Sequence, residues 1–477
     1  MSERKVTLVL VAIFILGAAA RLFALALDGP QHPDEFFQYL EPAWRHLTGA
    51  GVETWEWRRG VRSWALPGYN GSWMALLFAL GVLDGVKVVT LMRLHWALLS
   101  LALVWAGWRG GLLLARGLVP PGNEGSDAAP AGWQGGVGAA LLCALFPLLA
   151  RFSVHTLSEL AATLCLVVAL VMTGELATVP AGRGKAVWTG VLYGLGVGLR
   201  VQYAPLALVG GLWLLTGRRF RQLGWVMAAS LAPVLMFGIV DRVTWHGFFA
   251  SYVRYVEFNL FEGGAASFGT LPITWYGSQF LHRLPYGFAV LALAGLLGIR
   301  ASWPFLSAAL GVLVLHTVQP HKEERFLMLF WPLALIAAGG CIGAWAARAS
   351  SEKARWPRAA WLRSSVAGAL ILGILLDGAL HCRGNDFDLP PARYPAQAWV
   401  GHQPDVTGLL YDEPLYVGGY AWFGRTVPQV QFQAGLLANP IFSHVLVGRD
   451  SDAARTTERA GFSVLYTSGD FVILRRQ

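Results

Sequence analysis

Charge is scarce in this sequence: only 14% of its 477 residues are Asp, Glu, Lys or Arg, whereas 55% are hydrophobic. An average soluble domain carries about 25% charged residues. The chain therefore lacks the polar surface that a soluble enzyme of this size needs, and it is too apolar for a disordered protein. Its apolar residues form long blocks, not the alternating segments of about ten residues found in outer-membrane barrels. The composition predicts an all-α polytopic membrane protein.

Cysteine and the common soluble-enzyme motifs are also scarce or missing. Three of the four cysteines lie inside apolar blocks and Cys382 ends another, so we expect no disulfide framework. The sequence contains no Walker loop, no dinucleotide-binding glycine motif after a strand, no His-Glu-x-x-His and no paired Cys-x-x-Cys. We predict no cofactor and no metal site. The His and carboxylate residues of the polar clusters described below do not exclude a divalent cation.

About eleven segments approach the roughly 20 apolar residues that cross a bilayer. They are residues 6–27, 88–108, 134–150, 157–173, 186–199, 201–217, 222–241, 286–300, 303–318, 326–346 and 364–381. The first resembles a signal peptide, but ten further spans follow, so we interpret it as an uncleaved helix. A twelfth span at 71–85 would invert every later loop, and this segment is predicted to be interfacial or re-entrant.

The formal net charge is +9, and the position of the basic residues along the chain indicates which connections lie on the cytoplasmic side of the membrane. With a cytoplasmic N-terminus, every short basic connection falls inside, as the positive-inside rule requires. The opposite connections, 28–87, 151–156, 242–285 and 319–325, hold most of the Asp, Glu and His. The basic excess therefore predicts the orientation of a multi-pass membrane protein and no nucleic-acid partner. The composition and the Arg-rich loops are typical of a bacterial protein, which predicts the inner (plasma) membrane as its location.

The composition changes after residue 382. Residues 383–477 contain eight Arg, no Lys and nine acidic residues. Four strand-like runs and one helix, opened by Asp450, Ser451 and Asp452 and closed by Gly461, predict a small α/β domain. The runs are 406–411, 443–447, 463–467 and 471–475. We therefore predict a transmembrane catalytic domain over 1–382 and an extracytoplasmic domain over 383–477.

The first polar cluster lies in the first outer loop, from His32 to Glu41. Pro33 suits the first position of a helix, which places Asp34 and Glu35 in a first turn where the helix dipole stabilises carboxylates in their charged form. An ionised carboxylate at the membrane surface is what a general base requires. Asp34, Gln38 and Glu41 are expected to share one helical face. The alternative is an ordinary helix start with favourable capping charges.

Two further clusters lie on the same side. Thr54–Arg59 with Arg62 combines Trp, Glu and Arg, which is typical either of interfacial anchors or of a binding surface. In Gln319–Phe326, the side chains of His321, Lys322 and Arg325 are candidates to hold a phosphate, Arg through paired hydrogen bonds and Lys as a point charge. The alternative is a salt-bridged turn, in which Lys322 or Arg325 pairs with Glu323 or Glu324.

Taken together, these motifs resemble glycosyltransferase family 22, the mannosyltransferases of the dolichol-linked oligosaccharide and GPI-anchor pathways. The resemblance includes Asp241-Arg242…Trp245-His246-Gly247…Asn259, where Trp245 stands in place of the family's Tyr. It also includes His155-Thr156-Leu157-Ser158-Glu159, where His and Glu replace the family's Arg and Asn. The motifs span residues 31 to 326, and none that we can match covers the tail.

The resemblance implies a GT-C fold, an inverting transfer of mannose from a polyprenyl-phosphate donor, an extracytoplasmic active site and independence from metal. It implies Asp34 as general base, with Glu35 as second choice. Donor-phosphate ligands would be His321, Lys322, Arg325 and Arg200. Sugar or acceptor contacts would come from His32, Gln38, Trp55, Glu56, Trp57, Arg62, His155, Glu159, Asp241 and Asn259.

The residues do not determine the acceptor, which is a glycolipid, a surface polysaccharide precursor or a protein. They also do not determine that the transferred sugar is mannose. The competing hypothesis is a transporter or flippase of a lipid-linked or anionic solute. Against it, the sequence shows no repeat-related halves, and its polar clusters gather on one side of the membrane. A non-catalytic subunit with the same fold is the second alternative.

Overall fold

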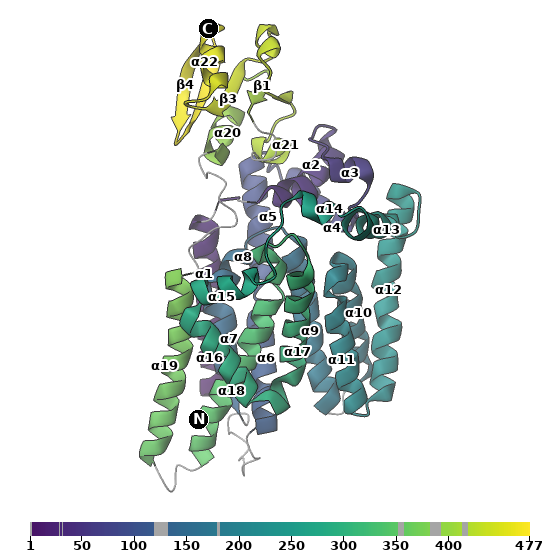
Figure 1. Cartoon of the computed structure of the whole chain (residues 1–477), viewed down its shortest axis with the longest axis vertical. Helices are drawn as coiled ribbons and strands as arrows, with labels where there is room; N and C mark the ends of the chain where they lie inside the picture. Colours follow the sequence, from purple (N-terminus) through teal and green to yellow (C-terminus); the bar gives the residue numbers. More distant parts are fainter. Residues whose placement is uncertain are drawn as a thin grey trace.

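The computed structural model describes residues 2–27, 29–30, 32–118, 132–178, 182–351, 357–381, 393–412 and 418–477. Figure 1 shows a long helical bundle with a small sheet domain at one end and the N-terminus near the other. The predicted boundary at 382/383 and Cys382 lie outside the described residues.

Each of the eleven predicted spans coincides with helical structure. The corresponding helices are α1 (Glu3–Leu27), α5 (Gly85–Leu99) with α6 (Ala102–Leu118), α7 (Trp133–Leu145), α9 (Ser158–Thr178), α10 (Arg183–Leu199), α11 (Ala204–Thr216), α12 (Phe220–Trp245), α16 (Pro285–Leu297), α17 (Ile299–Val318), α18 (Phe330–Ser351) and α19 (Pro357–His381). Within the described ranges, seven helical segments are long and apolar enough to cross a membrane, or eight if α15 (Trp275–Arg283) and α16, bent by 108°, form one broken span.

Two predicted spans are interrupted for local reasons. The segment 134–150 divides at Phe146 into α7 and α8 (Pro147–Phe152), because Pro147 has no N–H and disfavours a helical conformation in the residue before it. The segment 201–217 begins with a 3-10 turn, η2 (Val201–Tyr203), before α11 starts.

The centre of the bundle is formed by α6, α7 and α18, and α18 is buried along almost all of its apolar length. Glycines permit this close packing: a Cβ on Gly107 or Gly138 would overlap the backbone of the facing helix. Small residues are the usual means by which membrane helices approach each other.

Short helices cover the end of the bundle that carries the sheet domain (Figure 1). They are a π-helix η1 (Glu35–Leu40), α2 (Glu41–Thr48), α3 (Trp55–Arg59), α4 (Ala65–Ala79), α13 (Ala250–Val256), η3 (Glu257–Phe261), α14 (Gly264–Ser267) and η4 (Glu324–Leu327). The segment predicted to be interfacial or re-entrant, 71–85, largely falls in α4, which packs on η1, α2 and α5.

The C-terminal domain is a five-stranded sheet in the order β2-β1-β3-β5-β4. Its strands are β1 (Leu409–Tyr411), β2 (Gln429–Gln431), β3 (His444–Gly448), β4 (Phe462–Ser468) and β5 (Phe471–Arg476). All four predicted strands are confirmed, as is the predicted helix, α22 (Asp452–Arg459), capped by Ser451. β2 was missed because its three residues, Gln-Val-Gln, include only one apolar side chain and form too short a run to be recognised as a strand.

The sheet domain docks on the bundle through a buried carboxylate. Both oxygens of Glu41 accept backbone N–H groups: Oε1 from Val52 at 2.8 Å and Tyr420 at 3.0 Å, and Oε2 from Ala421 at 2.9 Å. Burial outweighs these donors and raises the pKa of Glu41 to about 7. The predicted shared face of Asp34, Gln38 and Glu41 is therefore wrong for Glu41. The physical reason is the wider π-helical turn between these residues, which does not keep the α-helical register.

Replacing Gly419 by Ala is expected to weaken this docking by about 1–3 kcal/mol, because Gly419 has a left-handed φ of +61° that costs any other residue strain. In addition, the new Cβ would lie 2.5 Å from Glu41 Oε2. Thermal unfolding of the purified protein in detergent measures the effect. Gly435→Ala is the matched control, since nothing lies within 4 Å of its added Cβ. Equal melting temperatures for both variants would contradict the prediction.

Candidate active site

A cavity of about 350 Å³ lies at the end of the bundle that carries the sheet domain, among residues far apart in the sequence. Eleven of the predicted site residues line it. They are His32, Asp34, Gln38, Trp55, Glu56, Arg62, Glu159, Arg200, Asn259, His321 and Arg325. The three polar clusters and the break between α10 and α11 thus meet in one place.

Asp34 faces this cavity and is held by Arg325. Its Oδ2 lies 2.7 Å from Arg325 Nη2, and the Asp34 side chain is 23% exposed. Burial raises the pKa of Asp34, but the positive charge of Arg325 outweighs it, so that the pKa is lowered from its usual value. Asp34 is therefore an ionised carboxylate with access to the cavity, as a general base must be.

Glu323 connects the groups around Asp34. Its carboxylate accepts from Arg325 Nε at 2.5 Å and lies 2.9 Å from His321 Nε2 and 3.2 Å from His32 Nε2. The Asp34 N–H donates to His32 Nδ1 at 3.0 Å, so this ring nitrogen carries no proton and Nε2 is the donor toward Glu323. The alternative of a salt-bridged turn is thus confirmed for Arg325 and Glu323, in the same residues that line the cavity.

Arg200 and Arg325 converge on one carboxylate oxygen. Glu159 Oε1 lies 3.0 Å from Arg200 Nη1 and 3.5 Å from Arg325 Nη1. The Arg200 side chain is 10% exposed and that of Arg325 is 7% exposed. The ring of Phe326 packs against both guanidinium groups, at 5.3 and 5.2 Å from its centroid. Guanidinium groups form charge-assisted, paired hydrogen bonds with phosphate, so two fixed arginines at the cavity wall have the chemistry of an anion site.

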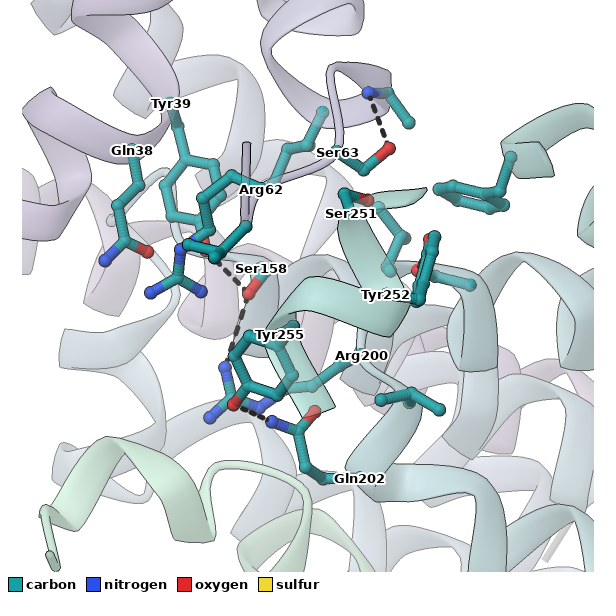
Figure 2. Close-up of a pocket in the computed structure, with 17 residues that line it drawn as sticks. Gln38, Tyr39, Arg62, Ser63, Ser158, Arg200, Gln202, Ser251, Tyr252 and Tyr255 are labelled. Carbon is teal, nitrogen blue, oxygen red and sulfur yellow. Dashed lines mark hydrogen bonds between the residues drawn. The ribbon is translucent and has the colours of Figure 1, made fainter. Parts of the chain in front are cut away.

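A smaller cavity of about 80 Å³ continues from the larger one and shares Gln38, Arg62, Arg200, Gln202 and Tyr255 with it. Figure 2 shows these side chains pointing into a common space, with Ser158 linked to Tyr39 and to Arg200. The mixed polar and aromatic lining is typical of a site that receives sugar hydroxyl groups.

Aromatic rings form one rim of the larger cavity. The Trp55 ring lies 4.7 Å from Phe258 and 6.0 Å from Phe268, centroid to centroid. Next to them, Arg59 Nη2 lies 2.8 Å from both carboxylate oxygens of Glu262. The first outer loop is thereby joined to the segment around η3 and α14.

Five predicted site residues do not line the cavity. Glu35 is fully buried and contacts His155 Nδ1 at 3.0 Å and the Thr156 N–H at 3.1 Å. Lys322 Nζ donates to the carbonyls of Gln319 and Leu271 at 2.5 and 3.0 Å. The remaining two position nearby backbone: Trp57 donates to the Phe37 carbonyl, and Asp241 accepts from Ser251.

Several lining residues were not in the predicted site: Gln202, Tyr255, Phe258, Phe268 and Glu323. The aromatic ones lie in α13, in η3 and directly after α14, at positions that none of the matched motifs specifies, and only their tertiary contacts reveal them. Glu323 was adjacent to nominated residues but had been assigned to the salt-bridge alternative. Within the described residues, no group of three or more His, Cys, Asp or Glu is arranged to hold a metal ion.

The sequence comparison decides the family. The model of the Alg9-like mannosyltransferase family matches residues 12–382. The chain belongs to the Alg9-like mannosyltransferase family. The GPI mannosyltransferase 3 of Yarrowia lipolytica is 30% identical over 422 residues, covering 84% of this chain and 74% of that protein. The mannosyltransferase APTG1 of Arabidopsis thaliana is 27% identical over 339 residues, which are 69% of this chain and 58% of that relative.

Solved structures show the fold of this family member. ArnT from Cupriavidus metallidurans bound to undecaprenyl phosphate has a TM-score of 0.58 at 11% identity and 97% coverage of both chains. The archaeal oligosaccharyltransferase AglB from Archaeoglobus fulgidus, in complex with an inhibitory peptide and a dolichol-phosphate, has a TM-score of 0.50 at 12% identity, covering 98% of this chain and 74% of AglB. The GT-C fold is thereby confirmed, and the findings support a membrane-embedded mannosyltransferase over a transporter.

Proposed function

We propose that this protein is an inverting glycosyltransferase that moves mannose from a polyprenyl-phosphate donor to a glycolipid or glycan acceptor. The observation that carries the proposal is a carboxylate, Asp34, beside two arginines, Arg200 and Arg325, in one cavity. We also propose a location for the reaction: this cavity and the C-terminal domain lie on the periplasmic or extracellular side of a plasma membrane. The proposal is supported by the described basic residues at the opposite helix ends, among them Arg109, Lys185, Arg219 and Arg348, because the positive-inside rule assigns such residues to the cytoplasmic side.

In the proposed reaction, Asp34 accepts the proton of an acceptor hydroxyl as its oxygen attacks the anomeric carbon of the donor sugar. The bond from that carbon to the phosphate oxygen breaks, and its electron pair leaves with the polyprenyl phosphate. Arg325 and Arg200, with His321, hold the phosphate. The side chain of Lys322 is placed away from the cavity, and in this proposal it shapes the turn.

The sugar and the acceptor occupy the remaining lining. Glu56 accepts from Gln38 Nε2 at 3.3 Å and lies 4.0 Å from Arg62, which leaves carboxylate and amide groups for hydroxyls. Trp55 and Phe258 offer apolar faces on which a sugar ring can pack. We propose that the reaction needs no metal, since guanidinium groups supply the positive charge at the leaving phosphate.

The experiment is transfer from radiolabelled polyprenyl-phosphate mannose in proteoliposomes that contain a membrane lipid extract. We expect free polyprenyl phosphate and one mannosylated product, at rates unchanged by EDTA. Loss of the rate in EDTA and its return with Mn²⁺ or Mg²⁺ would contradict metal independence. Movement of intact donor across the vesicle membrane without cleavage of the sugar–phosphate bond would contradict the enzymatic proposal itself.

A further inference from the structure

We propose that Glu159 makes the anion site selective for a singly charged phosphate diester over a doubly charged phosphate monoester. The inference rests on the proposed function, because it takes Arg200 and Arg325 as the ligands of the phosphate. It concerns a specificity-determining carboxylate, which the sequence placed only loosely among the sugar or acceptor contacts.

The position of Glu159 carries the inference. One of its oxygens lies between the two guanidinium groups, 3.0 Å from Arg200 and 3.5 Å from Arg325. The other oxygen accepts from Ser158 at 3.2 Å, and the residue is only 1% exposed. The carboxylate thus has little freedom to move away when a phosphate arrives, and its charge stays beside the bound anion.

The charged residues that line the whole cavity also favour a ligand with a single negative charge. The lining contains three arginines and four carboxylates, so each arginine already has an acidic neighbour. They are Arg62, Arg200, Arg325, Asp34, Glu56, Glu159 and Glu323. In a partly buried site, like charges repel more strongly than in water. A second negative charge on the ligand therefore meets repulsion from Glu159 that partly cancels its attraction to the arginines.

This selectivity separates the donor of the proposed reaction from its product. The donor is a diester with one negative charge, and the leaving polyprenyl phosphate is a monoester with two. During the transfer the total charge in the cavity is constant, because the acceptor proton neutralises Asp34 as the second phosphate charge forms. When Asp34 then releases the proton to solvent, the cavity gains one negative charge and Glu159 favours departure of the product.

The test is equilibrium binding by calorimetry at pH 8 in detergent, using farnesyl phosphate as the dianionic monoester and methyl farnesyl phosphate as the singly charged diester. A phosphate monoester has its second pKa near 6 and is doubly charged at this pH. We expect the wild type to bind the monoester at least about tenfold more weakly than the diester. In Glu159→Gln, the ratio of the two Kd values should fall at least about tenfold, through tighter monoester binding.

Two variants control for structural effects. Glu159→Asp keeps the charge and should keep the wild-type ratio. Glu175→Gln makes the same substitution at the far end of α9, where Glu175 lies 2.6 Å from Lys185, and should leave both Kd values unchanged.

The outcomes are distinct. Equal binding of the two ligands by the wild type overturns the inference without any variant, as does an unchanged ratio in folded Glu159→Gln. Failure of the wild type to bind either ligand overturns the proposed lipid-phosphate donor, and this inference with it.

Discussion

Asp34→Asn is expected to reduce kcat by about 10²–10⁴-fold while leaving the folded structure intact, because general-base catalysis contributes about this much. The amide retains the shape of the carboxylate but cannot accept a proton. Arg325 keeps Glu323 and Glu159 as partners, so no buried cation is left without a counter-charge. The measurement is mannose transfer under saturating donor, with Tm recorded for each variant.

The pH dependence gives a second readout of Asp34. Its pKa lies below the usual value of 3.8, since the positive charge of Arg325 outweighs burial, and the free enzyme therefore keeps the carboxylate ionised above about pH 4. We expect that Asp34 produces no acidic limb in kcat/KM between pH 5 and 8, because kcat/KM reports the free enzyme.

Two further variants serve as controls for the role of Asp34 as general base. Asp405→Asn changes a carboxylate of the C-terminal domain that pairs with Arg475 and is 47% exposed, and it should transfer mannose at the wild-type rate. Glu35→Gln should lower Tm, because Glu35 is buried against His155, Thr156 and Arg93. Full turnover by Asp34→Asn would exclude Asp34 as the base, and the buried Glu35, which does not line the cavity, could not replace it.

Arg325→Gln is expected to lower the free energy of unfolding by about 3–5 kcal/mol, the usual cost of removing one partner from a buried ion pair. Three carboxylates lose a shared cation: Asp34 at 2.7 Å, Glu323 at 2.5 Å and Glu159 at 3.5 Å. Chemical unfolding in detergent measures the loss. Arg59→Gln is the control, since Arg59 and Glu262 are 46% and 47% exposed and such pairs contribute at most about 1 kcal/mol.

The same variant tests the electrostatics of the base. Without Arg325, burial and the neighbouring Glu323 remain and raise the pKa of Asp34. Protonation then removes the base at higher pH, so the acidic limb of kcat/KM should move up toward neutrality. Farnesyl phosphate binding should weaken as well. An unchanged stability and an unchanged pH profile would together show that Arg325 is peripheral.

Features that depend on neighbours in the chain were predictable. The helices of the predicted spans need only a local apolar run, and β1, β3, β4 and β5 lie in local strand-like runs, so both were confirmed. The membrane side of the basic loops stays a prediction, which rests on counting charges. The scarcity of charge also made the clusters around Asp34, Arg62 and Arg325 visible, because charged side chains beside apolar spans have few structural reasons to be there.

Contacts between distant segments were not predictable, because no local pattern encodes them. Glu35 and Asp34 are adjacent, yet the fold buries one against His155, 120 residues away, and points the other at Arg325. The π-helical turn removed Glu41 from the predicted face and assigned it to the C-terminal domain. In the same way, the residue types of Glu159, Arg200 and Arg325 were evident in the sequence. Only the packing of the helices places one oxygen of Glu159 between the two arginines. The net charge of the anion site depends on that geometry.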